Sequence, residues 1–400
     1  MIRNLRHRAK LLGLMTAMSS VAMLAMACGI FGGDDPTPTP APAPTAAPIA
    51  APAATAEPVV EESTEVIMFH DGQWGSNWVH LAIARYVLEN GYGRETKEVQ
   101  GSTGTMKLTL IEGDVHINME TWRMNIPEWY EEHTATGALV DLAGTTGPTV
   151  MLPAGSPGQT IAVAGQGFYV PRYIVEGDAE RGIEATAPDL KSVQDLRNYK
   201  ELFADPNDPQ KGAVYNCIIG WECQKIVRAK WFAYDMYTDF NVVEPGSSAA
   251  LKAAVVAPYE AGEPFVSYYW QPTDVVNLRD LIMLEEPKNN PECQAALDLA
   301  VEEEPYESTI GCGFAIGDAH TTVNGEFAKR NPAVIEFLTN YYVEPKPLAA
   351  LEAYKAEAEV EWIDVAVKFL RENEVWTTWI TDDNKADIVA GIKDQLARED

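Results

Sequence analysis

Three tryptophans lie where an apolar run of the sequence gives way to a turn, and the face of an indole ring attracts cations more strongly than any other side-chain ring. Trp122 ends a mostly apolar segment, Trp221 lies between two cysteines, and Trp270 precedes a Gln-Pro pair. Aromatic faces brought together from separate loops would enclose a cation that has no N–H group to donate, such as a quaternary ammonium. We therefore expect Trp122, Trp221 and Trp270 to form a cation cage.

Tryptophan is also a common core residue, so its position along the chain decides its interpretation. Trp74 lies at the first expected strand-to-helix turn, a frequent place for ligands in α/β proteins, and is a possible cleft-lining residue. Tyr269 is another, because alternation along its strand turns one of Tyr268 and Tyr269 toward a cleft. We assign to core packing the tryptophans on or between expected helices: Trp129, Trp231, Trp362, Trp376 and Trp379.

The cysteines predict two disulfides. Apart from Cys28, four are present, an even number that favours disulfides in an exported chain. Of the three possible pairings, the short spacing favours Cys217–Cys223, which leaves Cys293–Cys312. A zinc site is the alternative, but the spacings match no zinc pattern. We expect no metal and no cofactor.

Motifs of catalysis are missing from the sequence. It contains no Gly-x-Ser-x-Gly, no His-Glu-x-x-His and no phosphate-binding loop. The acidic runs at 285–286 and 302–304 are interpreted as solvated surface. We expect a protein that is not an enzyme and has no catalytic residues.

The N-terminal segment predicts export to the cell surface or the periplasm. Residues 1–27 combine basic side chains with a short apolar stretch, as a signal peptide does. Cys28 then follows a small residue and is predicted to carry the lipid that anchors a bacterial lipoprotein to the membrane. Ordinary cleavage nearby is the alternative, since Ala25 occupies the position where leucine is usual. Residues 28–63 are the lipid attachment site and a tether rich in Pro, Ala and Thr.

The formal net charge of −29 excludes several partners. A strongly acidic surface repels nucleic acids and anionic lipid headgroups, so we expect neither as a partner. The residues from 64 onward are enough for a large core and more than one lobe.

Short apolar runs alternate with amphipathic segments, which is typical of an α/β fold. The expected strands cover 65–69, 114–119, 167–171 and 264–270. The expected helices cover 77–89, 106–111, 190–203, 224–236, 247–261, 326–342 (interrupted at Pro332), 347–358, 362–373 and 385–397.

From about residue 66 to residue 380, the chain resembles the substrate-binding proteins of ABC transporters for glycine betaine, proline betaine and related quaternary amines. The resemblance rests on ordered motifs: 113–122, ending in Trp122; 167–171; 195–203; the Cys-x-x-Gly-Trp-x-Cys-like loop 217–223; 262–272; and 331–338. It implies a two-lobed periplasmic-binding-protein fold of type II with the ligand in the inter-lobe cleft. The implied lobes are residues 64–165 plus 305–400, and residues 166–304.

The resemblance also implies how the ligand is held. The cage residues would be Trp122, Trp221 and Trp270, and the backbone N–H groups of Glu222 and Cys223 would bind the ligand carboxylate. Some relatives place a histidine four residues after the first cage tryptophan, where this chain has Ile126. Arg123 or Asn125 could replace that histidine.

The expected function is therefore that of an extracytoplasmic lipoprotein that captures glycine betaine or a related quaternary-ammonium osmolyte and delivers it to an ABC permease. One alternative keeps the fold and changes the ligand to choline, carnitine or another amine. The other alternative is a tethered sensory module or surface hydrolase on the same scaffold.

Overall fold

The computed structural model describes residues 63–144, 147 and 151–399. Cys28, the predicted signal peptide and nearly all of the predicted tether lie outside the described residues. In the part of the chain that the structure describes, none of the helices combines the length and the apolar character needed to span a membrane.

The strands of residues 63–399 join into a mixed sheet with the order β2-β1-β3-β11-β5-β9-β7-β6, while β4, β8 and β10 pair with β11, β7 and β5. Their bounds are β1 Ile67–Asp71, β2 Thr96–Gln100, β3 Ile117–Thr121, β4 Leu139–Asp141, β5 Gln159–Pro171, β6 Ala204–Asp205, β7 Asp208–Tyr215, β8 Phe240–Val243, β9 Ser267–Gln271, β10 Leu281–Met283 and β11 Gly317–Asn324.

Helices flank these strands. Their bounds are α1 Gly75–Asn90, α2 Thr103–Glu112, α3 Pro127–Thr136, α4 Arg172–Glu176, α5 Glu222–Ala233, α6 Ser248–Ala261, α7 Asp274–Leu278, α8 Pro291–Ala300, α9 Gly325–Arg330, α10 Pro332–Asn340, α11 Pro345–Ala358, α12 Trp362–Glu372 and α13 Lys385–Leu396, with the short 3-10 helices η1 Arg123–Asn125, η2 Val193–Tyr199 and η3 Val375–Thr378.

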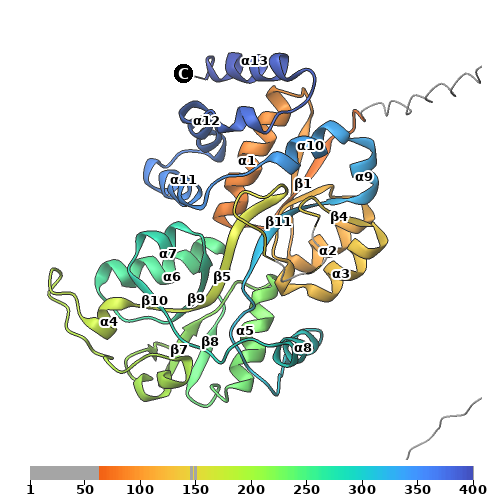
Figure 1. Cartoon of the computed structure of the whole chain (residues 1–400). Coiled ribbons are helices and arrows are strands. Elements are labelled where there is room, and N and C mark those ends of the chain that lie inside the picture. Colours follow the sequence, from red (N-terminus) through yellow and green to blue (C-terminus); the bar gives the residue numbers. More distant parts are fainter. Residues whose placement is uncertain (1–62, 145–146, 148–150, 400) are drawn as a thin grey trace, which may run out of the picture. The chain divides into compact units, whose positions relative to one another are not determined.

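The long strand β5 passes between two hydrophobic cores, and Figure 1 shows it in yellow between the two groups of elements. Its first half pairs with β11, and its second half pairs with β9 and β10. One core gathers α1, β1, β3 and the C-terminal helices, whereas the other gathers β5, β9, α5 and α6. The lobe boundaries expected from the sequence fall on β5 and on the segment between α8 and β11.

β11 was not expected from the sequence, because its residues are mostly polar. All of them are nevertheless buried, since β11 lies in the middle of the sheet between β3 and β5. Its polar side chains find partners there: Asp318 pairs with Arg123, and His320 Nδ1 lies 2.8 Å from Asp141 Oδ2. Buried polar groups are tolerated when they are paired in this way.

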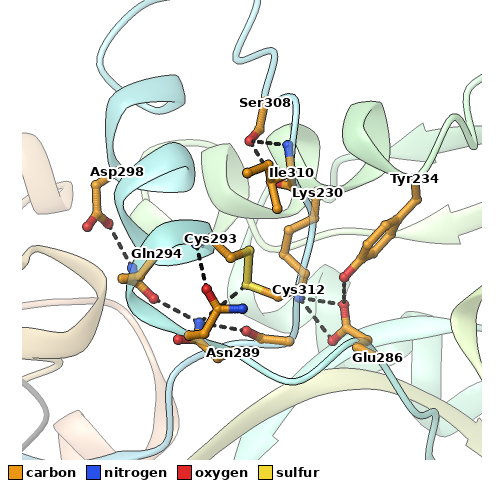
Figure 2. Close-up of a disulfide and its surroundings, with 12 residues drawn as sticks. Lys230, Tyr234, Glu286, Asn289, Cys293, Gln294, Asp298, Ser308, Ile310 and Cys312 are labelled. Atoms are coloured by element: carbon orange, nitrogen blue, oxygen red, sulfur yellow. Dashed lines mark hydrogen bonds and ion pairs between the residues drawn. A yellow bond between two sulfur atoms is a disulfide. The ribbon is translucent and has the colours of Figure 1, made fainter.

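Both predicted disulfides are confirmed. Cys293–Cys312 ties the start of α8 to the segment that leads into β11, as Figure 2 shows. In the same region the Lys230 ammonium lies 2.7 Å from Glu286 Oε1, and the Tyr234 hydroxyl donates to the same oxygen at 2.9 Å. This buried pair fixes α5 against the segment after β10. The expectation that the Glu286 carboxylate is solvated was therefore wrong, because Lys230 and Tyr234 hold it in a buried position.

Candidate functional site

The three tryptophans expected in a cage line one pocket, in which the empty space amounts to about 570 Å³ including its open mouth. Its wall comes from the ends of β1 and β3, the starts of α1, α2 and α5, the 3-10 helix η1, the disulfide loop before α5, and strands β5 and β9. The lining residues are His70, Trp74, Thr103, Met106, Asn118, Glu120, Trp122, Asn125, Ile126, Gln166, Trp221, Glu222, Cys223, Tyr268 and Trp270.

Trp74, expected as a possible lining residue, is part of the same aromatic cluster. The ring centroids of Trp74 and Trp221 lie 5.6 Å apart, and those of Trp221 and Trp270 lie 5.4 Å apart, each pair at an interplanar angle of 87°. Perpendicular rings present faces in different directions around a small volume. Together with Trp122, they give the pocket an aromatic wall suited to a cation without hydrogen-bond donors.

Hydrogen bonds fix how several of these rings are turned. Trp221 Nε1 donates to the carbonyl oxygen of Gly72 at 2.9 Å. Trp74 Nε1 donates to Glu120 Oε2 at 2.8 Å, and Trp122 Nε1 donates to the same oxygen at 3.2 Å. Because the polar edges are used in this way, the apolar faces of the rings are left for a ligand.

β3 explains how Glu120 and Trp122 come to the same pocket. Side chains two residues apart on a strand share a face, and Asn118, Glu120 and Trp122 all line the pocket. Glu120 is 1% exposed, and burial raises its pKa to about 7. Sequence reasoning missed this residue, although the alternation that ends in Trp122 would have indicated it.

The disulfide loop presents Trp221 at the start of α5. Cys217–Cys223 closes the loop, and Gly220 inside it adopts a φ of 102°, which favours glycine. Gly220 also accepts a hydrogen bond from the Thr103 N–H at 3.0 Å, which ties the loop to α2. As the first two residues of α5, Glu222 and Cys223 have N–H groups without a partner inside the helix.

The two side chains expected as substitutes for the missing histidine differ in position. Asn125 lines the pocket and exchanges two hydrogen bonds with Gln166, at 3.1 and 3.0 Å. Arg123 does not line it: its guanidinium is fully buried, pairs with Asp318 and also contacts His320. Arg123 is thus committed to the buried network of β11, and Ile126 gives the pocket an apolar contact.

Of the two neighbouring tyrosines, Tyr268 faces the pocket and Tyr269 does not. Tyr269 instead stacks against Trp270, with centroids 4.7 Å apart and an interplanar angle of 7°. The Tyr268 hydroxyl donates to Gln166 Oε1 at 2.9 Å. We expected Tyr269 to line the cleft, but Tyr268, which lies on the opposite face of β9, lines the pocket instead.

The other tryptophans assigned to packing lie in the cores or at their margins. Trp231 belongs to the core around β5, and Trp376 and Trp379 belong to the core around α1. Trp129 and Trp362 are partly buried against a core. Among the described residues, no group of His, Cys, Asp and Glu side chains could hold a metal ion.

Residues 67–372 match the family described as the substrate binding domain of ABC-type glycine betaine transport systems. The chain is 25% identical over 199 residues to the glycine betaine/proline betaine-binding periplasmic protein of Escherichia coli (strain K12), an alignment that covers 47% of this chain and 57% of that protein. The chain thus spans little more than half the length of the curated relatives it matches.

Solved structures show the fold. A choline-binding protein of an ABC transporter, in complex with choline, superposes with a TM-score of 0.58 at 17% identity, covering 83% of this chain and 98% of that one. The glycine betaine/L-proline-binding protein of Borrelia burgdorferi gives a TM-score of 0.56 at 16% identity, covering 81% and 100%. The two-lobed, type II periplasmic-binding-protein fold is thereby confirmed.

The matched family consists of transporter-associated binding domains rather than enzymes, as the lack of catalytic motifs predicted. The chain belongs to the family of substrate-binding domains of ABC-type glycine betaine transport systems.

Proposed function

We propose that this protein captures a quaternary ammonium compound, glycine betaine or a close relative, and delivers it to the permease of an ABC transporter. The observation that carries the proposal is the pocket wall of Trp74, Trp122, Trp221 and Trp270, contributed by four separate segments. A methylated ammonium has no N–H donor, so ring faces and shape must recognise it. Each desolvated cation–ring contact contributes about 1–2 kcal/mol.

Closure of the two lobes would complete the site. The lobes would be residues 64–165 plus 305–400, and residues 166–304. Trp221 supports closure, because it belongs to the second core but donates its N–H to Gly72, which lies next to β1. Closed lobes exclude water from the cation, and the permease would recognise the closed form.

The start of α5 offers the donors for a polar group on the ligand. The N–H groups of Glu222 and Cys223 lie at the positive end of a helix, a place that suits a carboxylate or hydroxyl oxygen. The Asn125 amide is a further donor on the lining. These three residues, and not Arg123, would hold the polar group.

Export and anchoring belong to the same proposal. A lipid on Cys28 would hold the protein at the outer face of the membrane, and the Pro-rich tether would let the binding domain reach the permease. Release of a Cys28→Ser variant into the medium or the soluble periplasmic fraction is the expected sign of this anchor.

Calorimetry with Trp270→Ala tests the binding site. We expect the purified domain to bind at least one of glycine betaine, choline and carnitine, and the variant to bind it at least tenfold more weakly. Trp362→Ala is the matched control, because Trp362 is a partly buried tryptophan on α12, outside the pocket lining. An unchanged dissociation constant in Trp270→Ala would remove the cage from the proposal.

The alternative function, a tethered sensory module, predicts the same binding but no transport. Deleting the gene should abolish uptake of the labelled ligand if the protein serves a permease. Uptake that persists in the deletion strain, together with a lost transcriptional response to the ligand, favours the sensor.

A further inference from the structure

The charges that line the pocket are all negative. Glu120 and Glu222 are lining residues, and among the lining residues that the structure describes there is no lysine or arginine. His70 also lines the pocket, but burial lowers its pKa to about 4, so it is neutral near pH 7. A ligand that enters therefore meets carboxylates and ring faces, with no cationic side chain to hold a carboxylate.

Glu120 is placed directly behind the aromatic wall. Its Oε2 accepts hydrogen bonds from Trp74 Nε1 and Trp122 Nε1, and a third from the Ser76 hydroxyl at 3.2 Å. Its Oε1 accepts none from the residues that the structure describes and lies 3.7 Å from His80 Nε2. A carboxylate bonded to the edges of two indoles adds negative potential to rings that already attract cations.

We propose that Glu120 is the counter-charge of the bound cation, so that the pocket selects quaternary ammonium compounds with a net positive charge over zwitterionic ones. This inference rests on the proposed function and specifies its ligand class. A choline-like ligand brings one positive charge and a hydroxyl, for which the α5 N–H groups are suitable donors. A betaine brings an additional carboxylate, which ionised Glu120 repels, whereas the charge of Glu222 is paired with the Lys225 ammonium at 3.2 Å.

His80 and Glu352 are two ionisable side chains that lie near Glu120. His80 on α1 is buried and hydrogen bonded through Nδ1 to the Tyr341 hydroxyl at 2.8 Å, and burial lowers its pKa to about 3, so it stays neutral. Burial raises the pKa of the Glu352 carboxyl on α11 well above its usual range, which favours the neutral form of this side chain.

The same burial raises the pKa of Glu120 to about 7, so part of the empty protein carries the proton at neutral pH. A bound cation stabilises the ionised form of Glu120. Binding should therefore release a proton from the protein.

Calorimetry on the domain tests the inference with four probes: choline, tetramethylammonium, glycine betaine, and 3,3-dimethyl-1-butanol as the uncharged isostere of choline. We expect the wild type to bind choline at least tenfold more tightly than glycine betaine and than the uncharged isostere. In Glu120→Gln, the preference for choline over glycine betaine and the preference for choline over the uncharged isostere should each fall at least fivefold. Glu128→Gln, an exposed carboxylate of α3 outside the lining, is the matched control and should keep the wild-type ratios.

A second measurement uses only the wild type, so it tests the inference even if Glu120→Gln fails to fold. Choline titrations near pH 6.5 in buffers of different ionisation enthalpy should show proton release by the wild type. Unchanged ligand ratios in a folded Glu120→Gln, or choline binding without proton release, would overturn the inference. If none of the charged probes binds the wild type, the proposed function itself fails, which is a different outcome.

Discussion

Each tryptophan of the pocket has a polar edge as well as two ring faces, and the partner of its N–H group decides how the faces are turned. Trp74 and Trp122 share one carboxylate oxygen, whereas Trp221 donates to a backbone carbonyl. Among the described residues Trp270 Nε1 has no hydrogen-bond partner, and stacking on Tyr269 holds its ring instead. The rings are thus oriented before a ligand arrives, which lowers the entropy cost of binding.

Replacing Trp221 by phenylalanine separates the two roles of this residue. The variant keeps a ring face but loses the hydrogen bond to Gly72, a bond whose loss typically costs about 1 kcal/mol. We expect the dissociation constant to rise about threefold to tenfold, and by more in Trp221→Ala. Stopped-flow fluorescence should place most of this change in the dissociation rate, because the closed lobes lose a contact. Equal affinities for Trp221→Phe and Trp221→Ala would contradict a role for the ring.

At this scale the sequence predicts the rings better than the charges. Trp122, Trp221 and Trp270 could be selected because each lies at a turn, a position that the chain itself reveals. The alternation along the strand indicates the face on which Glu120 lies, but the burial that raises its pKa comes from tertiary neighbours and could not be predicted. Arg123 was misinterpreted for the same reason, since its partner Asp318 is 195 positions away in the chain.

Among the elements, those with regular apolar patterns were predictable, and β11 was not. The helices of the C-terminal part follow the expected segments closely, down to the interruption at Pro332 between α9 and α10. The expected helix over 190–203 is instead the 3-10 helix η2, with a capping box between Ser192 and Asp195. β11 carries polar residues into the centre of the sheet, where only tertiary partners explain them.

The two disulfides hold different elements, so removing each one should have a different effect on ligand binding and on stability. Cys217–Cys223 spans a separation of six residues and holds the loop that carries Trp221, so its loss should affect binding. We expect Cys217→Ser/Cys223→Ser to weaken ligand binding at least fivefold. The longer loop closed by Cys293–Cys312, with a separation of 19, contributes about 3 kcal/mol to stability by chain entropy.

Cys293→Ser/Cys312→Ser is the matched control for that prediction. Urea unfolding should show the larger loss of stability in this variant, while calorimetry shows an affinity within about twofold of the wild type. Neither cysteine of this pair lines the pocket, so a strong loss of affinity would contradict the separation of roles. Equal binding by the Cys217/Cys223 variant would show that α2 and α5 position the loop without the disulfide.

Across the whole of residues 63–399, buried ionisable groups link the two cores. Glu352 lies on α11, which packs in the first core, and the backbone of Asp274 at the start of α7, which packs in the second core, hydrogen bonds to its carboxyl group. Gly75 makes room for this carboxyl, since a Cβ there would lie 2.4 Å from Glu352 Oε2. The contact between α11 and α7 therefore places a buried acid between the two cores.

The pKa shifts of the buried groups set how stability changes with pH. The pKa values of Glu120 and Glu352 are raised by burial, so the native state holds their protons more tightly than the unfolded chain does. The free energy of unfolding that these two groups contribute is fully present below about pH 4. It is lost as the pH rises toward their pKa values in the folded protein. His70 and His80 act oppositely: because their pKa values are lowered, stability rises with pH through these groups, but only up to about pH 6.5.

His320, like Glu120 and Glu352, makes the protein less stable as the pH rises. Burial alone would lower its pKa, but hydrogen bonds to Asp141 and Asp318 raise it. Its contribution is present below about pH 6.5 and is lost as the pH rises through the folded pKa. Above about pH 6.5, the raised pKa values of Glu120, Glu352 and His320 therefore all make stability decline as the pH rises.

Glu352→Gln should flatten this decline. The amide keeps the shape and a hydrogen-bond acceptor for the Asp274 backbone but cannot ionise, so the variant avoids placing a negative charge between the two cores. Urea unfolding at pH 6.5 and pH 9 should show that the wild type loses more stability over this interval than Glu352→Gln, by at least about 1 kcal/mol. Glu336→Gln, an exposed carboxylate on α10, should follow the wild type. Parallel pH profiles for wild type and Glu352→Gln would mean that the carboxyl stays protonated, or reaches water, throughout this range.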